Sequence, residues 1–203
     1  RARQEAETAR QVSKFLVDLF QDADPAQAKG GTITAREILD RGAARIPTEL
    51  ARQPAVQARL LSTMGDVYLA LGLYEPAGSL LEQALAKQEA LPSADPAELA
   101  TTLDRLGGLT HDLRDMARSE DYSRRALELR RRTLGPEHPD VAESLINVAI
   151  SARGNGRLDE AAAEYEAVVD IGTRTLGRTS EPTLAAMNGL AMTYVDLARL
   201  PEA

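Results

Sequence analysis

Apolar residues recur along this chain with the spacing of amphipathic helices. Residues 61–68 follow an i, i+3, i+4, i+7 pattern, which places their apolar and small side chains on one helical face. A second stripe follows in residues 77–85, and Gly72 between the two can adopt the positive φ of a tight turn. The pattern predicts two antiparallel helices with these buried faces: Leu61, Met64, Gly65 and Tyr68 on the first, and Ala77, Leu80, Leu81, Ala84 and Leu85 on the second.

The same pattern returns every 42 residues, with large apolar positions remaining large and small positions remaining small. Leu61, for example, is followed by Leu103, Leu145 and Met187 at this interval. A regular period of this length is typical of stacked helical repeats. We therefore predict an all-α fold, an α-solenoid of antiparallel helix pairs, with repeats at residues 58–100, 101–142 and 143–184 and a partial repeat at 185–203. The small residues Gly65 and Ala77 are expected to let the two helices of a pair approach closely.

Residues 1–57 show a weaker form of the pattern and are predicted to form a degenerate helix pair with a linker. The segment "DADPAQAKGG" is expected to break the chain between its two helices. Thr34 and Glu37 have the spacing of a capping box at the start of the second helix. The first helix is predicted to bury one apolar stripe: Val12, Phe15, Leu16, Leu19 and Phe20.

The second repeat, residues 101–142, departs from the pattern at its turn, where Arg114 replaces the glycine found at Gly72. An arginine that keeps the left-handed conformation costs about 1 kcal/mol. The sequence therefore predicts either a distorted turn or a repeat of reduced stability.

The segment "MGDVYLALGLYEPAGSLLEQAL" resembles a tetratricopeptide repeat (TPR), and the linker "LGPEHPDVAESLINVA" together with the 42-residue period resembles the longer repeats of kinesin light chains. This resemblance covers roughly residues 55–203. It implies a right-handed superhelix that binds a peptide or partner protein on its concave side. "EAETARQVSKFLVDLFQDADP" with "ITAREILDRGAARI" is similar to the segment before the repeats of bacterial TPR-containing serine/threonine protein kinases. That likeness implies a regulatory region of such a kinase or of another signalling protein.

The resemblance places the binding surface on the first helix of each pair, and helical geometry selects the side chains opposite the packing stripe. Asn147 and Asn188 suit this role because an amide both donates to and accepts from a peptide backbone; the alternative is that they are ordinary solvated residues. The surface becomes apolar toward the C-terminus, at Ile146, Ile150, Met192 and Val195, which indicates either a binding site or a covered surface. The predicted partner-binding residues are Arg59, Asp66, Arg105, His111, Asn147, Ile150, Arg153, Asn188 and Met192.

Other candidates for chemistry are weaker. The stretch "TLGPEHPDVAESL" holds His138 among prolines and carboxylates, but the equivalent positions in the neighbouring units hold serine and aspartate. We interpret it as a connector between units, with Pro139 in the first turn of the next helix. His111 and His138 show no third ligand for a metal. The arginines of "YSRRALELRRRTL" (Arg124, Arg125, Arg130, Arg131 and Arg132) could bind phosphate or an acidic partner, but we expect them on the outer face of a second helix.

Composition limits the function. The net charge of −7 argues against nucleic-acid binding, which usually needs a basic excess. No apolar run has the roughly 18 residues of a membrane span, and cysteine is absent, as is common in cytoplasmic proteins. The chain begins without methionine and is expected to be part of a longer protein. We predict a non-catalytic, cytoplasmic protein-interaction scaffold that needs no cofactor or metal; self-association or autoinhibition of an attached enzyme is the alternative, and an enzyme is disfavoured.

Overall fold

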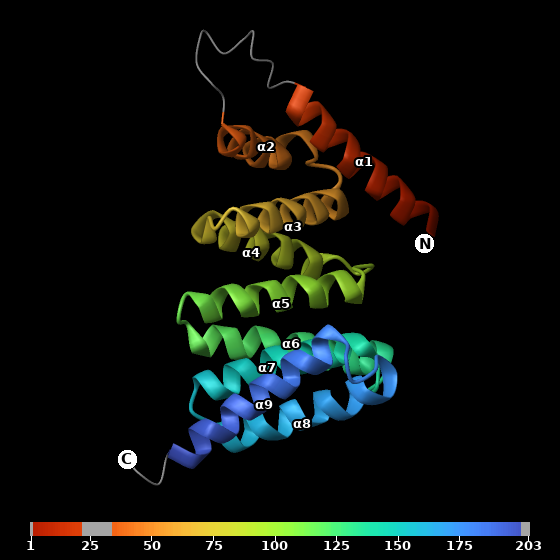
Figure 1. Cartoon of the computed structure of the whole chain (residues 1–203). Coiled ribbons are helices and arrows are strands. Elements are labelled where there is room, and N and C mark those ends of the chain that lie inside the picture. Colours follow the sequence, from red (N-terminus) through yellow and green to blue (C-terminus); the bar gives the residue numbers. More distant parts are fainter. Residues whose placement is uncertain (1, 22–33, 200–203) are drawn as a thin grey trace. The chain divides into compact units, whose positions relative to one another are not determined.

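The computed structural model describes residues 2–21 and 34–199, in two compact units, Arg1–Ala94 and Asp95–Ala203. Every regular element in the described residues is an α-helix, and no strand occurs among them, so the predicted all-α class is confirmed (Figure 1). The first unit contains α1 (Ala2–Gln21), α2 (Ala35–Glu49), α3 (Pro54–Ala70) and α4 (Tyr74–Ala90). The second contains α5 (Pro96–Asp112), α6 (Met116–Leu134), α7 (Pro139–Gly154), α8 (Leu158–Thr175) and α9 (Glu181–Arg199).

The helix pair α3 and α4 provides most of the core of the first unit. All residues of the two predicted stripes are buried, which confirms the helical faces assigned to them. Leu60 of α3 and Ile46 of α2 extend this core. The buried hydroxyl of Tyr68 donates a hydrogen bond to Asp40 of α2, and burial raises the pKa of Tyr68. The hydroxyl of the tyrosine is thus hydrogen-bonded while its ring packs in the core.

Helices α1 and α2 complete the first unit. Val12 and Phe15 join the core cluster and Leu19 is also buried, as the stripe on α1 predicted, whereas the side chain of Phe20 lies outside the described residues. At the start of α2 the N–H of Glu37 donates to Thr34 Oγ1 (3.2 Å) and the N–H of Thr34 donates to Glu37 Oε2 (2.9 Å). The predicted capping box is therefore confirmed. The predicted break at "DADPAQAKGG" also lies outside the described residues.

Gly65 lets α3 and α4 approach closely. A Cβ atom added there would lie 2.7 Å from Cγ of Leu81, far inside the 3.5–4.0 Å of an ordinary carbon contact. Gly107 has the same role in the next pair, where an added Cβ would lie 2.7 Å from Oγ of Ser123. The predicted need for small residues between paired helices is confirmed.

Gly189 of α9 also lies at a close approach, which the sequence did not predict. Gly189 follows the predicted binding residue Asn147 by 42 residues, so the repeat assigns it to the open face, but a Cβ added there would lie 2.4 Å from Cζ of Tyr165 in α8. This assignment was wrong because the Tyr165 ring, itself only 3% exposed, extends far enough to reach the next helix. The residue of α6 that is equivalent to Tyr165, 42 residues earlier, is the smaller Ser123.

Alanine substitution at two helix glycines is expected to give opposite changes in stability. In an open helix position alanine is favoured over glycine by about 1 kcal/mol, and an added Cβ at Gly108 of α5 meets nothing within 4 Å. Gly108→Ala should therefore stabilise the protein, whereas Gly189→Ala should destabilise it by about 1–3 kcal/mol because of the clash with Tyr165. Chemical denaturation measures both changes, and a shift in the same direction for both variants would contradict the close packing at Gly189.

Three tight turns spaced 42 residues apart join the helices of the three pairs. Each contains one residue with positive φ: 70° at Gly72, 64° at Arg114 and 76° at Gly156. Around Arg114, its N–H donates to the carbonyl of His111 (2.9 Å) and the N–H of Asp115 donates to that of Thr110 (2.8 Å), and the other two turns have the same pair of bonds. The distorted turn considered from the sequence is therefore wrong, because Arg114 adopts the glycine conformation.

Replacing Arg114 with glycine is expected to stabilise the protein by about 1 kcal/mol, because the left-handed conformation is strained for a residue that carries a Cβ. The reverse exchange at the equivalent turn, Gly156→Arg, is the matched control and should lose a similar amount. Thermal and chemical denaturation of both variants measure the two changes. A destabilised Arg114→Gly variant would mean that the arginine side chain contributes more than its backbone strain costs.

The stretch "TLGPEHPDVAESL" connects α6 to α7, as predicted. Gly135 ends α6 with a φ of 88°, and Pro139 occupies the first turn of α7. His138 is the N-cap of α7, because its Nδ1 accepts the N–H of Asp140 at 3.2 Å. A side chain that accepts from a free N–H at a helix start stabilises that helix. The histidine of this stretch therefore has a structural role.

Candidate functional site

The predicted binding residues lie on the first helix of each pair. In the first unit, Arg59 and Asp66 are half-buried on α3. In the second unit α7 contacts both α5 and α9, so the predicted residues of three neighbouring helices can be compared directly. They are Arg105 and His111 on α5, Asn147, Ile150 and Arg153 on α7, and Asn188 and Met192 on α9.

Two of these residues form contacts between successive first helices. The amide of Asn147 donates to Oδ1 of Asp104 on α5 (3.2 Å). Arg153 contacts Oδ2 of Asp196 on α9 through both Nε (2.8 Å) and Nη2 (2.7 Å). Each contact joins residues 43 positions apart, one repeat plus one residue. These polar groups therefore hold successive first helices together, whether or not they also contact a binding partner.

The apolar residues of the predicted surface differ in their exposure. Ile146 and Ile150 of α7 are half-buried and pack against the core cluster of the second unit. Met192 and Val195 of α9 are 45% and 48% exposed. The open apolar part of the surface therefore lies on α9.

A buried ion pair connects α5, α6 and α7. Nη1 of Arg130 lies 2.7 Å from Oδ2 of Asp104, and the two side chains are only 7% and 10% exposed. The same nitrogen donates to Ser144 Oγ (2.9 Å) and to the carbonyl oxygen of Asp140 (3.0 Å). The prediction that Arg130 lies on the outer face of α6 was wrong, because Asp104 and the start of α7 provide acceptors that replace water around the guanidinium.

Burial raises the pKa of Asp104 to about 6. The positive charge of Arg130 and the hydrogen bonds from Asn147 and Ser144 act in the opposite direction, while the nearby Glu143 carboxylate adds to the increase. Loss of hydration disfavours the charged carboxylate more than these partners favour it. The folded state therefore raises the pKa of the Asp104 carboxyl toward neutral pH, well above the usual value for an aspartate.

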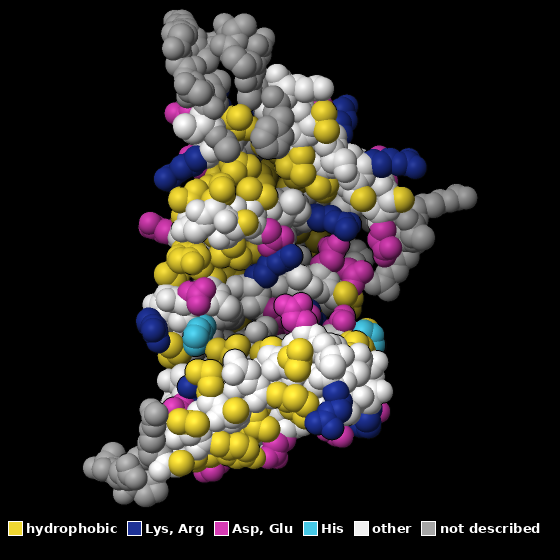
Figure 2. Space-filling view, viewed as in Figure 1, with side chains coloured by type: hydrophobic (Ala, Val, Ile, Leu, Met, Phe, Trp, Pro, Cys, Tyr) yellow, Lys and Arg dark blue, Asp and Glu magenta, His cyan; other side chains and the backbone are white. Residues whose placement is uncertain are grey.

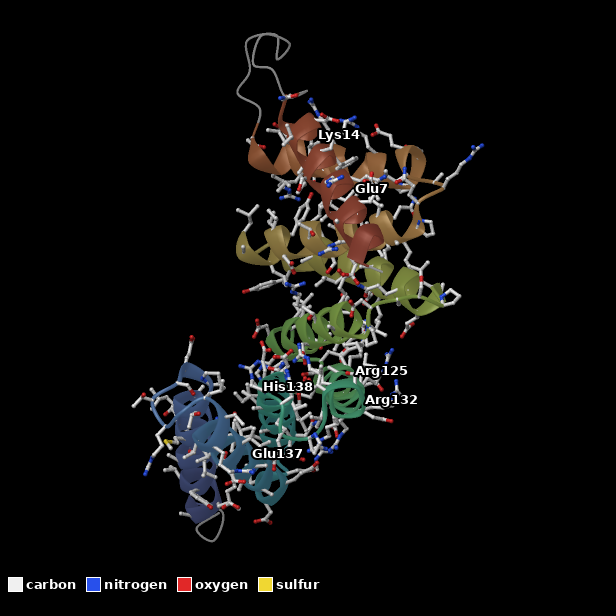
Figure 3. The ribbon with its side chains drawn as sticks, turned by 90° about the vertical axis from the view of Figure 1, so that its right-hand side faces the viewer. Glu7, Lys14, Arg125, Arg132, Glu137 and His138 are labelled. Carbon is white, nitrogen blue, oxygen red and sulfur yellow. The ribbon has the colours of Figure 1, made fainter. Side chains whose placement is uncertain are left out.

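The remaining arginines of α6 lie on its outer side, as predicted. Arg125 and Arg132 are on the side of α6 away from α9 (Figure 3). Arg124 contacts Glu120 of its own helix (2.9 Å) and Glu160 of α8, and Arg157 lies 2.6 Å from Glu120. These exposed pairs join α6 to α8 and each contributes little to stability.

The histidines lie in separate places: His111 near the end of α5 and His138 at the start of α7. Among the residues that the structure describes, no three His, Asp or Glu side chains are grouped so that they could hold a metal ion. The same part of the chain contains no helix with the length and apolar character required to cross a membrane.

Antiparallel helix pairs with a 42-residue register, tight turns and small residues between paired helices define a helical-repeat solenoid. The tetratricopeptide repeat model matches residues 98–166 and, in a second copy, residues 145–203. These matches cover more than half of the chain, which therefore belongs to the tetratricopeptide repeat family. No curated protein matches it.

Several solved structures share this fold. The chain is similar to the nearly identical TPR-like repeats of a kinesin light chain-like protein from Podosopora anserina, with 23% identity, a TM-score of 0.70, and 96% of this chain and 90% of that one covered. It is also similar to BtubC (BKLC) from P. vanneervenii, with 21% identity, a TM-score of 0.66, and coverage of 81% and 68%. The crystal structure of MamA matches with 14% identity and a TM-score of 0.51, over 85% of this chain and 100% of that one. The predicted likeness to kinesin-light-chain-type repeats is confirmed at the level of the fold.

Proposed function

We propose that this chain is a non-catalytic scaffold that binds a peptide or partner protein on the first-helix surface of its second unit. Its membership of the tetratricopeptide repeat family carries this proposal, because proteins of this family generally mediate protein–protein interactions. The surface offers apolar area on α9 next to polar groups on α7, a combination suited to a peptide that has both a backbone and apolar side chains to place.

The contacts within the chain refine the set of binding residues. Asn147 and Arg153 already contact residues of this chain, Asp104 and Asp196. In the proposed complex their main effect is therefore to position the helices. We propose Ile150, Asn188 and Met192 as the residues that contact a peptide directly. Arg105 and His111 of α5 remain proposed contacts at the margin of this set. Arg59 and Asp66 of α3 belong to the first unit and remain proposed contacts of that unit by itself.

The test compares two exposed apolar residues of the second unit. Met192 on α9 lies in the proposed surface, whereas Leu113, which is 54% exposed at the end of α5, lies in a turn. A partner captured with the unmodified chain and then purified should bind the Met192→Asp variant at least about ten-fold more weakly, the effect of losing a central contact. The Leu113→Asp variant should bind as before. Equal binding to all three folded proteins would overturn the proposal.

The kind of protein that contains this scaffold is a second, more specific proposal. The resemblance of the N-terminal segment supports a regulatory region of a bacterial serine/threonine kinase or another cytoplasmic signalling protein. The sequence of the complete gene tests it, because the proposal requires a kinase or other effector domain in the same protein. Self-association or autoinhibition is the alternative, and a monomer at all concentrations in light scattering would count against self-association.

A further inference from the structure

The Asn147 side chain has one polar group that is paired within the chain and one that is open. Its amide nitrogen donates to Oδ1 of Asp104 on α5 (3.2 Å). Its own oxygen, Oδ1, accepts no hydrogen bond from the described residues and is not among their buried oxygens that lack a partner. Because Asn147 is half-buried on α7, this oxygen is an accessible hydrogen-bond acceptor on the first-helix surface.

The two oxygens of Asp104 have separate partners, and this determines which way the Asn147 amide faces. Oδ2 lies 2.7 Å from Nη1 of Arg130, whereas Oδ1 faces Asn147. Ser144 Oγ lies 3.3 Å from both oxygens. An ionised carboxylate only accepts hydrogen bonds, whereas an amide has one donor end and one acceptor end. Asn147 therefore turns its nitrogen toward Asp104 and its oxygen away from it.

Asp104 itself is not available to a ligand. Its side chain is 10% exposed, and its charge is opposed at 2.7 Å by Arg130, which is 7% exposed. The acceptor that reaches the surface is therefore the uncharged oxygen of Asn147. An uncharged donor such as the N–H of a peptide backbone suits this oxygen, because amide N–H and amide oxygen are the pair that every helix and sheet uses.

Apolar area lies close to this acceptor. Ile150 follows Asn147 by three residues on α7, and Met192 and Val195 of α9 are exposed. Figure 2 shows hydrophobic side chains along α9. An extended peptide presents backbone N–H groups between its side chains, so a surface with an acceptor beside apolar area can bind both at once.

We propose that Asp104 is a positioning residue of the first-helix surface: it turns the Asn147 amide so that the surface offers an acceptor to a backbone N–H of the bound peptide. This role rests on the proposed function and specifies the chemistry that one part of the site recognises. Asn147 then both holds α7 to α5 and contacts the peptide, through different ends of the same amide.

The substitution Asp104→Asn should reverse the Asn147 amide. The guanidinium of Arg130 only donates, so the new side chain keeps its oxygen toward Arg130 and turns its nitrogen toward Asn147. Two donors would then face each other, and Asn147 relieves this by presenting its nitrogen to the surface. Adding Asn147→Asp to Asp104→Asn restores an acceptor on both sides of position 147, so the double variant should recover the original pattern.

Hydrogen exchange of the asparagine side chains tests the orientation without a ligand. The chain has three asparagines. Asn155 donates to Oε2 of Glu120 (2.9 Å), whereas the side chain of Asn188 has no hydrogen bond within the described residues. At pH 7.5 the Asp104 carboxyl is ionised, because its pKa is raised only to about 6. In nuclear magnetic resonance spectra, the Asn147 amide should exchange about two- to ten-fold more slowly than that of Asn188, the range expected for one hydrogen bond. Asp104→Asn should remove this difference and leave Asn155 unchanged.

The binding probe is a synthetic twelve-residue peptide, selected from a random phage-displayed library on the unmodified chain. Asp104→Asn should weaken its binding about five- to ten-fold, the effect of one lost hydrogen bond and one opposed donor. The double variant with Asn147→Asp should bind within about two-fold of the unmodified chain. Ser144→Ala, which removes another neighbour of Asp104 without reversing the amide, should bind as before. Methylation of one backbone nitrogen of the peptide should weaken binding to the unmodified chain but cause no further loss with Asp104→Asn.

Three results would overturn this role of Asp104. The first is an Asn147 exchange rate that is the same in the unmodified chain and in Asp104→Asn. The second is a binding loss in Asp104→Asn that the double variant does not recover although circular dichroism shows it to be folded. The third is a peptide in which no methylated nitrogen couples to Asp104→Asn. A peptide that needs Met192 but is indifferent to Asp104→Asn sinks this inference and leaves the proposed function standing, whereas a chain that selects no peptide counts against both.

Discussion

Replacing Arg130 with alanine is expected to lower the free energy of unfolding by about 3–5 kcal/mol, the usual cost of removing one partner from a buried ion pair. The variant would leave the Asp104 carboxylate, 10% exposed, without its nearest positive charge. Ser144 and the carbonyl of Asp140 would also lose their shared donor. Because these groups belong to α5 and α7, the loss should weaken the contact of α6 with both helices.

Two variants make this expectation sharper. Arg132→Ala removes an exposed arginine from the same helix and should change stability by no more than about 0.5 kcal/mol. Combining Arg130→Met with Asp104→Leu removes both charges and should recover much of the loss. Chemical denaturation followed by circular dichroism gives the free energies, and hydrogen exchange assigns the loss to α5–α7. If Arg130→Ala costs no more than Arg132→Ala, the buried pair does not stabilise the fold.

The helical stripes, the turns and the close approach at Gly65 could be predicted from the sequence because each depends on residues near one another in the chain. The 42-residue register then repeats these local features, so the helix pairs follow with little further information. Even the position of Arg114 could be identified as a left-handed site from its alignment with Gly72 and Gly156.

The polar contacts of the candidate site could not be predicted in the same way. An assignment at 100° per residue gives the direction of a side chain but not what stands opposite it. Asn147 was assigned to the open face, and Asp104 of the preceding first helix accepts a hydrogen bond from its amide. Arg130 did leave a signal, because it lies four residues after the buried Ala126 and so continues the packing stripe of α6. A charged residue on a packing stripe indicates a buried partner of opposite charge, although the stripe does not say which carboxylate it is.

The pH dependence of stability should show the state of Asp104 directly. Its pKa is raised from 3.8 to about 6 in the folded protein, mainly by burial. A carboxyl group with a raised folded pKa contributes most to stability when it is protonated, below its unfolded pKa, and this contribution is lost as the pH rises through about 6. Relative to an Asp104→Asn variant, which stays neutral, the unmodified protein should therefore gain about 2 kcal/mol of stability between pH 7 and pH 4.

The comparison with Asp104→Asn isolates Asp104 and its direct interactions, because carboxylates that do not interact with it titrate in the same way in both proteins and their effects cancel. Urea denaturation at intervals between pH 4 and pH 7 gives the difference in unfolding free energy. A difference that stays flat would mean that Asp104 titrates alike in the folded and unfolded states. A difference that moves in favour of the unmodified protein as the pH rises would mean that attraction to Arg130 outweighs the loss of hydration. The direction of the slope therefore decides which of the two opposing effects controls the ion pair that joins α5, α6 and α7.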